Sequence, residues 1–325
     1  MPISPPPPEV EVVVVHAPRL PALGGEAVFA VQQIDAQDLK TAPRLDAALK
    51  RAPGVSLFRR TGSDAANPTI QGISLRGVAP SGAGRALVTL DGAPQNDPFG
   101  GWVIWSALPP EGLESVTLVR GAGAGAYGAG ALTGVVALEE RGATEGVSAL
   151  DLSVAPRGGA RAAAALGTTG LLLTASAETS DGYTPVRGGR GAADVPTTLE
   201  AGSFAFRVQG EYAGVVGALR LGVYEEKRGA GLVGAHSTAR GGSATATLAR
   251  IINGGGWRLQ AWARSSDLAN TSSAVAAGRV ATTPAADQYS TPALGYGFNA
   301  AWQGRREAFS WEVGGDARFA DGHAF

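Results

Sequence analysis

Apolar and polar residues alternate over long stretches of the second half of the chain, from about residue 143 onward. Near the C-terminal end, Phe309, Trp311 and Val313 share one face, whereas Ser310 and Glu312 share the other. Because successive side chains of a strand point to opposite faces, this period of two predicts strands with one apolar face. The pattern predicts about nine strands, near residues 147–155, 160–167, 171–180, 199–212, 217–228, 240–252, 256–268, 294–303 and 308–320.

The connections between these predicted strands alternate in length. The short ones fall near 168–170, 213–217, 253–256 and 304–307, and the longer ones near 181–198, 229–239 and 269–293. Alternating strands with short turns at one end and long loops at the other are typical of a transmembrane β-barrel. A soluble β-sandwich is the alternative, but it does not require longer loops at one end. We therefore expect antiparallel transmembrane barrel strands over residues 143–325.

Residues 25–142 have a different pattern, in which short apolar runs alternate with loops rich in glycine, proline and asparagine. Asp35 and Thr41 are placed to cap two short helices, and apolar residues at helical spacing follow from Leu45 to Ala52. Strands are predicted near 69–76, 86–90, 115–120 and 134–139. We expect a compact α+β domain in this region.

The first 24 residues combine a proline run, Pro5–Pro8, with the β-branched run Val12–Val15. Polyproline is extended, and β-branched residues favour strands, but no hairpin partner follows nearby. Such a segment can add itself as a strand to the sheet edge of another protein. We predict a Pro-rich tether over residues 1–24, with a disordered leader as the alternative.

Composition excludes several classes of function. The 48 glycines and 20 prolines disfavour a helical bundle, while 44% hydrophobic residues and a net charge of −1 disfavour disorder. Without cysteine, and with three histidines far apart, the chain offers no thiol catalysis and no recognisable metal-ligand spacing. The near-zero charge argues against non-specific nucleic-acid binding. We expect no enzyme, no metal and no cofactor. Neither an apolar helical span nor a signal peptide is visible in the sequence.

A series of motifs runs through residues 25–142. They are APGV (52–55), NPTIQGISLRG (67–77), LDGAP (90–94), LESVTLVRG (113–121) and AYGAGALTGVV (126–136). In this order and spacing they resemble the plug domain of TonB-dependent outer-membrane receptors. The resemblance implies that the alternating region is the barrel of such a receptor in the outer membrane of a Gram-negative cell. It also implies active uptake of a scarce solute, such as a siderophore–iron complex or cobalamin.

The resemblance further implies roles for individual residues. The TonB box, which pairs by strand addition with the periplasmic TonB protein, would be Val12, Val13, Val14, Val15, His16 and Ala17. Two plug arginines would be locked to glutamates on the barrel wall, namely Arg76 and Arg120; their alternative is a surface position. The apical loops of the plug would bind an extracellular ligand such as a metal chelate through Asn67, Asn96, Asp97, Phe99, Trp102 and Trp105. Rings would stack on it and Asn or Asp would hydrogen-bond to it. For the two tryptophans, packing in the plug core or on the wall is the alternative.

The number of predicted strands is small for a receptor of this kind. Plugged outer-membrane transporters have about 22 strands, and bacterial single-chain barrels have an even number. With about nine, we expect an incomplete barrel belonging to the N-terminal part of a longer receptor. A non-functional truncated remnant and a passive porin-like barrel are the alternatives.

Residues 123–128 also satisfy the GxGxxG pattern after a predicted strand. A dinucleotide-binding turn would use these glycines at a helix start, with Glu139 or Glu140 on the ribose. The glycines that follow, and the β-branched pair Val135 and Val136, instead favour a strand. A helix after Gly130 would favour the dinucleotide-binding turn, whereas a strand would favour the plug domain.

Overall fold

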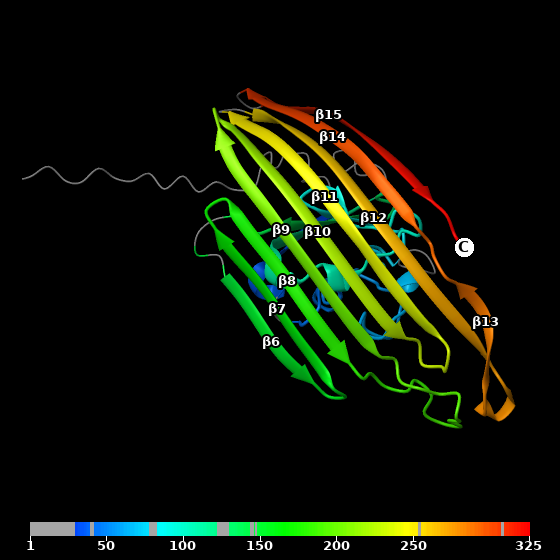
Figure 1. Ribbon diagram of the computed structural model, residues 1–325. Coiled ribbons are helices and arrows are strands. Elements are labelled where there is room, and N and C mark those ends of the chain that lie inside the picture. Colours follow the sequence, from blue (N-terminus) through cyan, green and yellow to red (C-terminus); the bar gives the residue numbers. More distant parts are fainter. Residues whose placement is uncertain are drawn as a thin grey trace, which may run out of the picture.

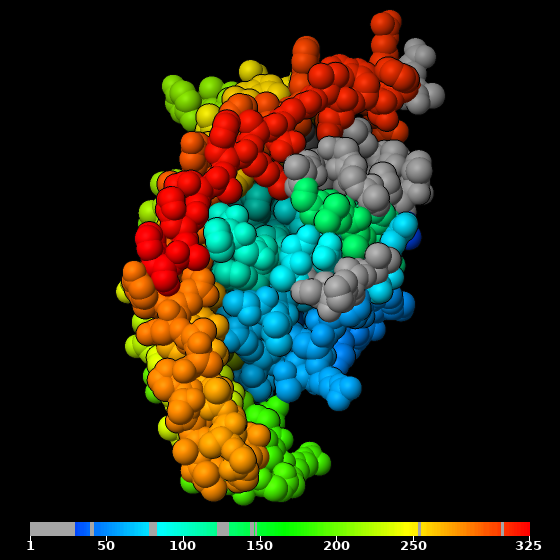
Figure 2. Space-filling model, turned by 90° about the vertical axis from the view of Figure 1, so that its right-hand side faces the viewer, coloured from blue at the N-terminus to red at the C-terminus, as the bar shows by residue number. Residues whose placement is uncertain are grey.

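The computed structural model describes residues 30–39, 42–77, 83–121, 130–143, 146, 148–252, 255–306 and 309–325. It has two parts, which we call the small domain (residues 30–143) and the large sheet (residues 148–322). In Figure 1 the small domain, coloured blue to teal, lies behind the broad curved strands of the large sheet. Figure 2 shows strands in orange and red passing along one side of the small domain.

The small domain is built on a mixed five-stranded sheet of order β1-β4-β5-β2-β3. Strands β2 and β5 are parallel, and the other neighbours are antiparallel. Its elements are β1 (Ala30–Asp35), α1 (Ala36–Leu39), α2 (Leu45–Leu49), the 3-10 helices η2 (Pro68–Ile70), η3 (Trp105–Ala107) and η4 (Pro110–Gly112), and the strands β2 (Leu87–Leu90), β3 (Ala93–Pro94), β4 (Leu113–Arg120) and β5 (Gly134–Glu140).

The core of the small domain lies between its two helices and this sheet. Leu39 from α1 and Leu45 and Leu49 from α2 are fully buried. They belong to one apolar cluster with Val116 of β4 and Val136 of β5. The helical spacing of Leu45 and Leu49 explains why so short a helix is stable, since both side chains fall on the face turned to the sheet.

The large sheet is antiparallel, with nine strands in the order β15-β14-β12-β11-β10-β9-β8-β7-β6, and β13 pairs only with β12. The strands are β6 (Ser148–Ala155), β7 (Gly159–Thr168), β8 (Leu171–Ser180), β9 (Leu199–Tyr212), β10 (Val215–Gly229), β11 (His236–Ile252), β12 (Gly255–Val275), β13 (Thr282–Gln288), β14 (Ala293–Arg306) and β15 (Phe309–Gly322). All nine predicted strands are present. Strand β13 lies where the sequence predicts only a long loop.

The two faces of the large sheet differ in chemistry. The face turned away from the small domain exposes large apolar side chains, such as Leu219, Leu221 and Val223 along β10. The face turned toward it carries buried polar side chains, such as Arg207 and Gln260. An apolar outer face and a polar inner face are the pattern of a membrane barrel strand. The described strands from residue 148 onward all belong to this one sheet, so the β-sandwich interpretation of that region is wrong.

Several local expectations for the small domain are wrong. Residues 69–76 form η2 and an isolated bridge between Ser56 and Ser74 instead of a strand. Strand β1 was not expected. Helix α2 has Arg44 at its N-cap without a side-chain hydrogen bond, and Thr41 lies outside the described residues. The element after Gly130 is strand β5, with no helix between them, so the dinucleotide-binding interpretation is wrong as well.

No helix in the described part of the chain is both long enough and apolar enough to cross a membrane.

Candidate functional site: the interface between the small domain and the large sheet

The two parts meet through ion pairs in which the large sheet supplies arginine and the small domain supplies carboxylate. Arg161 of β7 binds Glu111 of η4 with both terminal nitrogens, at 2.8 and 2.7 Å. Both side chains are only 8% exposed. A parallel pair of N–H···O bonds of this kind is stronger and more directional than a single one. Asp151 of β6 also accepts from Arg161, at 2.9 Å.

The tip of the β2–β3 hairpin is a second anchor. Asp91 and Gly92 form its two-residue turn, with φ angles of 47° and 88°. An Asp-Gly pair favours such a turn, because both positions need positive φ. The Asp91 carboxylate pairs with Arg207 of β9 at 3.0 Å. The Asp91 carbonyl accepts from Arg258 Nη2 at 2.6 Å and from Gln260 Nε2 at 2.9 Å, both on β12.

The end of β5 and the segment after β3 complete this anchor. Glu140 Oε1 pairs with Arg220 Nε of β10 at 2.9 Å, and its Oε2 lies 3.8 Å from Arg207 Nη1. Arg264 of β12 donates to Gln95 Oε1 at 3.1 Å and lies 5.6 Å above the Tyr224 ring. Four arginines of the large sheet therefore surround the hairpin tip, Gln95 and Glu140.

In the first part of the small domain, one ion pair has the opposite arrangement, with arginine on the small domain and carboxylate on the large sheet. Arg44 pairs with Glu178 of β8. Arg228 of β10 binds Glu226 on its own strand and donates to the Asp64 carbonyl at 2.8 Å. Asn67, one of the predicted ligand residues, donates to Asn270 Oδ1 of β12 at 2.8 Å while accepting from the Thr69 amide. Asn67 is therefore a bridge between the two parts.

Asn96 and Asp97, also predicted as ligand residues, hold the loop that carries them. Asn96 donates to the carbonyls of Ala86 and Gly101 and accepts from the Val88 amide. Asp97 caps the amides of Phe99 and Gly100 and accepts from Ser266 Oγ of β12 at 2.6 Å. These bonds use both Asp97 oxygens and leave its side chain 6% exposed.

The three predicted aromatic residues lie in different environments. Trp105 is 2% exposed in the core of the small domain. Trp102 packs against Tyr224, Ala239 and Leu268 of the large sheet. Phe99 is 50% exposed. Both tryptophans thus occupy the packing positions given as their alternative, and Phe99 alone of the three presents a largely open ring.

Neither predicted lock arginine forms an ion pair with the described strands of the large sheet. Arg120 donates to Gln32 Oε1 and to the Pro53 carbonyl, both at 2.6 Å and both within the small domain. Arg76 is exposed. The TonB-box residues Val12–Ala17 lie outside the described residues.

The sequence does contain a signal for the ion pairs that were missed. Arg207, Arg258 and Arg264 stand on the polar face of alternating strands, opposite apolar neighbours. In a sheet with a lipid-facing side, an arginine at such a position must point to the other side. Alternation therefore identifies the arginines, but their partners depend on the fold of a domain more than a hundred residues away.

Three long connections of the large sheet, β8–β9, β10–β11 and β12–β13, are joined to one another by hydrogen bonds and an ion pair. Asp194, in the β8–β9 loop, binds Arg279 of the β12–β13 turn through both oxygens. Hydrogen bonds from Arg279 and from the Gly191 amide lower the pKa of Asp194 from 3.8 to about 2. The Val195 amide donates to the Gly231 carbonyl in the β10–β11 loop at 3.2 Å. We call these residues, 191–195, 231–233 and 276–281, the loop cluster.

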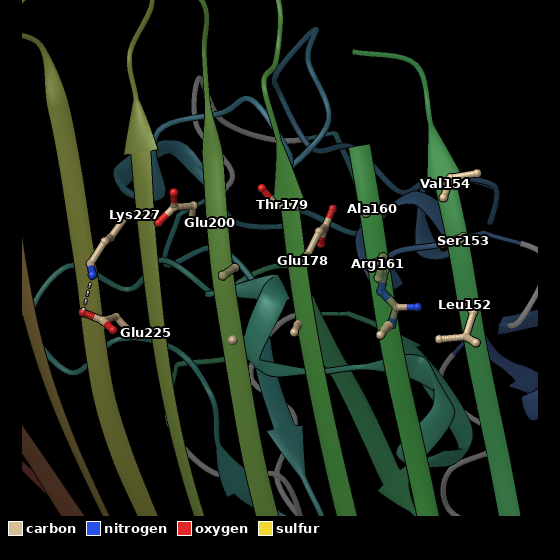
Figure 3. Close-up of a pocket in the computed structure, with 14 residues that line it drawn as sticks. Leu152, Ser153, Val154, Ala160, Arg161, Glu178, Thr179, Glu200, Glu225 and Lys227 are labelled. Carbon is tan, nitrogen blue, oxygen red and sulfur yellow. Dashed lines mark ion pairs between the residues drawn. The ribbon is translucent and has the colours of Figure 1, made fainter. Parts of the chain in front are cut away.

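A groove of about 720 Å³ lies across β6 to β10 on the outer face of the large sheet (Figure 3). Exposed Leu152 and Val154 line one side, and the Glu225–Lys227 ion pair, 3.5 Å long, lies at the other. The small domain lies behind these strands in Figure 3. Arg161 and Glu178, which pair with the small domain, also belong to its lining, whereas none of the predicted ligand residues does.

Comparisons with known proteins agree with this architecture. A family model described as the TonB-dependent receptor plug domain matches residues 25–135. No curated protein matches the chain by sequence. Solved structures that resemble it include the copper transporter OprC (TM-score 0.70, 17% identity, 90% of this chain and 46% of that one). They also include the siderophore receptor PirA from Acinetobacter baumannii (TM-score 0.62, 16% identity, 89% of this chain and 48% of that one). A third is the ferric citrate transporter FecA (TM-score 0.65, 16% identity, 90% of this chain and 47% of that one).

The chain thus spans about half the length of the solved structures that it matches. Identities of this size establish a common fold, and the family model identifies the small domain. The resemblance found in the motifs is confirmed. The chain combines a TonB-dependent receptor plug domain with antiparallel strands that share the fold of the barrels of those receptors.

Proposed function

We propose that the chain forms part of a TonB-dependent receptor that takes up a scarce solute across the outer membrane. One observation carries this proposal. A plug-type domain is ion-paired to the polar face of a sheet whose other face is apolar. An apolar outer face suits a lipid environment, and a docked domain on the inner face would close the path until it moves. A passive porin-like barrel has no use for such a domain.

The solute that fits best is a metal chelate from outside the cell, such as a siderophore–iron complex, with cobalamin as a further candidate. Structures of the same fold carry the names copper transporter, siderophore receptor and ferric citrate transporter. Phe99 is the strongest candidate contact, since its ring is half exposed on a loop stiffened by Asp97. Asn67 would couple solute binding to the large sheet, because its side chain is hydrogen-bonded to Asn270 of β12.

Energy would come from the periplasmic TonB protein, which would pair with Val12–Ala17 as an added strand. Deleting residues 9–17 should abolish uptake of labelled ferric siderophores or cobalamin and leave the receptor in the outer membrane. Val14→Pro should act in the same way, because proline removes a backbone donor that strand pairing uses. Pro6→Ala, in the proline run, is the matched control and should transport normally. Uptake that survives both changes would overturn the proposal in favour of a passive pore.

Localisation gives an independent test. An antibody against residues 25–142 should detect a heat-modifiable band in outer-membrane fractions, as expected for a folded barrel protein. A product of this chain's own mass that is absent from the outer membrane would contradict the transport proposal and favour a non-functional remnant. Arg76 would be tested in the same cells. Its replacement by glutamine should change uptake only if it pairs with a wall glutamate in the assembled receptor.

A further inference from the structure

The loop between β3 and η3 contains a stiff turn at residues 97–101, which we call the latch loop. The Asp97 amide donates to the Trp102 carbonyl at 2.7 Å and closes the turn. One carboxylate oxygen of Asp97 accepts from the amides of Phe99 and Gly100, at 2.9 and 2.8 Å. Because these bonds fix the backbone at both ends and in the middle, the latch loop keeps its shape when it is pushed.

The large sheet presents small residues to the latch loop. Strands β14 and β15 pass along one side of the small domain (Figure 2), and their register pairs Ala293 with Gly322 and Gly295 with Ala320. Residues directly opposite on two antiparallel strands share one face. The two glycines face the small domain, because a side chain on either would meet it. These four residues therefore form one patch of the inner face, which we call the seat.

The latch loop fits against the seat without room for another carbon atom. A Cβ atom placed on Gly295 would lie 3.0 Å from Pro98 Cγ, and one placed on Gly322 would lie 2.6 Å from Phe99 Cδ2. Neither glycine has a φ in the left-handed region, so the backbone itself does not require glycine there. Glycine inside a strand can mark the close approach of another segment. The latch loop is that segment here.

The latch loop is also tied to β12, the next strand of the sheet. Asp97 accepts from Ser266 Oγ at 2.6 Å. The Trp262 ring lies beside the seat, since its Cζ3 would be 3.5 Å from a Cβ atom on Gly295. Contacts of the latch loop therefore involve three neighbouring strands, β12, β14 and β15. A sliding movement of the small domain over these strands must first withdraw the loop from the seat.

We propose that the latch loop fixes the resting position of the small domain on the large sheet and leaves the seat before the domain moves. Long arginine side chains elsewhere in the interface can follow a small displacement by changing rotamer. A stiff turn packed against backbone atoms cannot. The loop also carries the half-exposed ring of Phe99, so the latch lies where the proposed solute would bind. This inference rests on the proposed uptake function and specifies where the required movement begins.

Thiol labelling can measure the release of the small domain, since the chain has no cysteine of its own. In the intact receptor, Ala239→Cys places a thiol on β11 in the cluster around Trp102, at a site that is 2% exposed. A water-soluble maleimide should reach this thiol only when the small domain lifts. Gly322→Ala and Gly295→Ala should each raise the labelling rate about tenfold, because the added methyl group overpacks the seat. Gly315→Ala, also in β15, is the matched control, with no atom within 4 Å of its new Cβ.

A second change separates crowding at the seat from a general loss of stability. Phe99→Ala removes the ring that faces Gly322 but leaves Pro98 against Gly295. Gly322→Ala combined with Phe99→Ala should label no faster than Phe99→Ala alone, because the added methyl group then has room. Gly295→Ala combined with Phe99→Ala should show the product of the two separate effects, as expected for independent sites.

Two results would overturn the inference. One is a labelling rate in both glycine variants equal to that of Gly315→Ala. The other is a product of separate effects for Gly322→Ala with Phe99→Ala. If Gly322→Ala does not fold, as judged by heat modifiability, Gly295→Ala with Pro98→Ala replaces that pair and should label no faster than Pro98→Ala alone.

The labelling assay is independent of transport. Val233→Cys in the β10–β11 loop, 46% exposed, should label fast in every background and gives the reactivity of the reagent. The assay uses purified protein and needs neither TonB nor an identified solute. Loss of uptake on deleting residues 9–17 tests the proposed function separately. The latch can therefore fail while the receptor proposal stands, and the reverse also holds.

Discussion

Arg161 forms ion pairs with two carboxylates that differ in burial. We expect the more buried carboxylate to contribute more to the stability of the folded protein. The Glu111 side chain is 8% exposed and the Asp151 side chain 40% exposed. Glu111→Gln should lower the free energy of unfolding by about 1–3 kcal/mol, because it leaves a buried guanidinium with one partner fewer. Asp151→Asn should cost at most about 1 kcal/mol, as expected of a solvent-screened pair. Denaturant unfolding in detergent micelles measures both.

Hydrogen exchange at η4 and β7 would show where the loss acts. Faster exchange at both elements in Glu111→Gln, with β2 and β3 unchanged, is the expected pattern. Equal destabilisation by the two variants would contradict the view that burial sets the strength of this contact.

Gly92 is constrained both by its backbone and by its neighbours. Its φ of 88° belongs to a two-residue hairpin turn that side chains other than glycine or asparagine rarely adopt. Gly92→Ala should therefore destabilise the protein by about 1–2 kcal/mol through left-handed strain, with extra crowding against Arg258. Gly210→Ala is the control, since it lies in β9 with no atom within 4 Å of a new Cβ. Comparable melting temperatures for the two variants would contradict this account.

Among the elements, the loop cluster has its own pH dependence. The folded-state pKa of Asp194 is lowered from 3.8 to about 2, so the Arg279 contact stabilises the folded form above pH 3.8. That stabilisation is lost as the pH falls from 3.8 through 2, because the carboxyl group then takes up a proton. The hydrogen-exchange protection factors of residues 191–195, which correct for the pH dependence of the chemical exchange rate, should fall over this interval in the wild type. In Asp194→Asn the protection factors should already be low at neutral pH and change little on acidification.

The outer face of β10 allows a direct test of lipid contact. Leu221 and Val233 are both exposed, at 37% and 46%, but Leu221 is in the strand and Val233 in the β10–β11 loop. A lysine near the bilayer centre costs about 2–4 kcal/mol on a barrel strand and almost nothing in a loop. Leu221→Lys should therefore reduce folding into lipid vesicles, monitored by heat modifiability, while Val233→Lys folds normally. Equal folding of both variants would argue against a membrane-facing β10.

The strands of the large sheet were predictable because each carries its own pattern. Alternation along β9, β10 or β12 is a local property, because one face is apolar and exposed and the other carries polar side chains toward the small domain. The small domain gives weaker signals. Strand β1 exists because it pairs with β4, whose paired residues lie 80 to 90 positions later in the chain. Residues 71–75 are buried without being a regular strand. Non-local partners override local propensity at such sites.

The candidate site was harder to predict than the fold for the same reason. Asn96, Asp97 and Trp105 have the residue types of a ligand site, but their loop uses them for its own structure. The arginines of the large sheet were visible on the polar faces of strands. Their pairing with Asp91, Glu111 and Glu140 required the docked arrangement of both parts.

At the scale of the whole molecule, the two faces of the large sheet differ in the environment that they suit. Lipid-compatible side chains lie outside, and a charged seam inside joins the sheet to a domain with its own apolar core. The contacts that hold this seam are ion pairs and hydrogen bonds, with one small apolar cluster around Trp102. Such a boundary can separate without exposing the apolar core of the small domain. The proposed uptake would require the small domain to move and return, and this division would allow it.

The lengths of the central strands have a consequence for the cell surface. Strand β12 has 21 residues and β11 has 17, whereas a tilted strand crosses a bilayer with about 9–11. The outward side chains change from apolar to charged at Arg240 and Asp267, which form an ion pair. In the outer membrane, the remainder of these strands would rise roughly 20 Å above the lipid as a stiff platform. Of the described residues, this platform and the loop cluster at its rim would then lie farthest from the lipid, where large particles outside the cell can reach them.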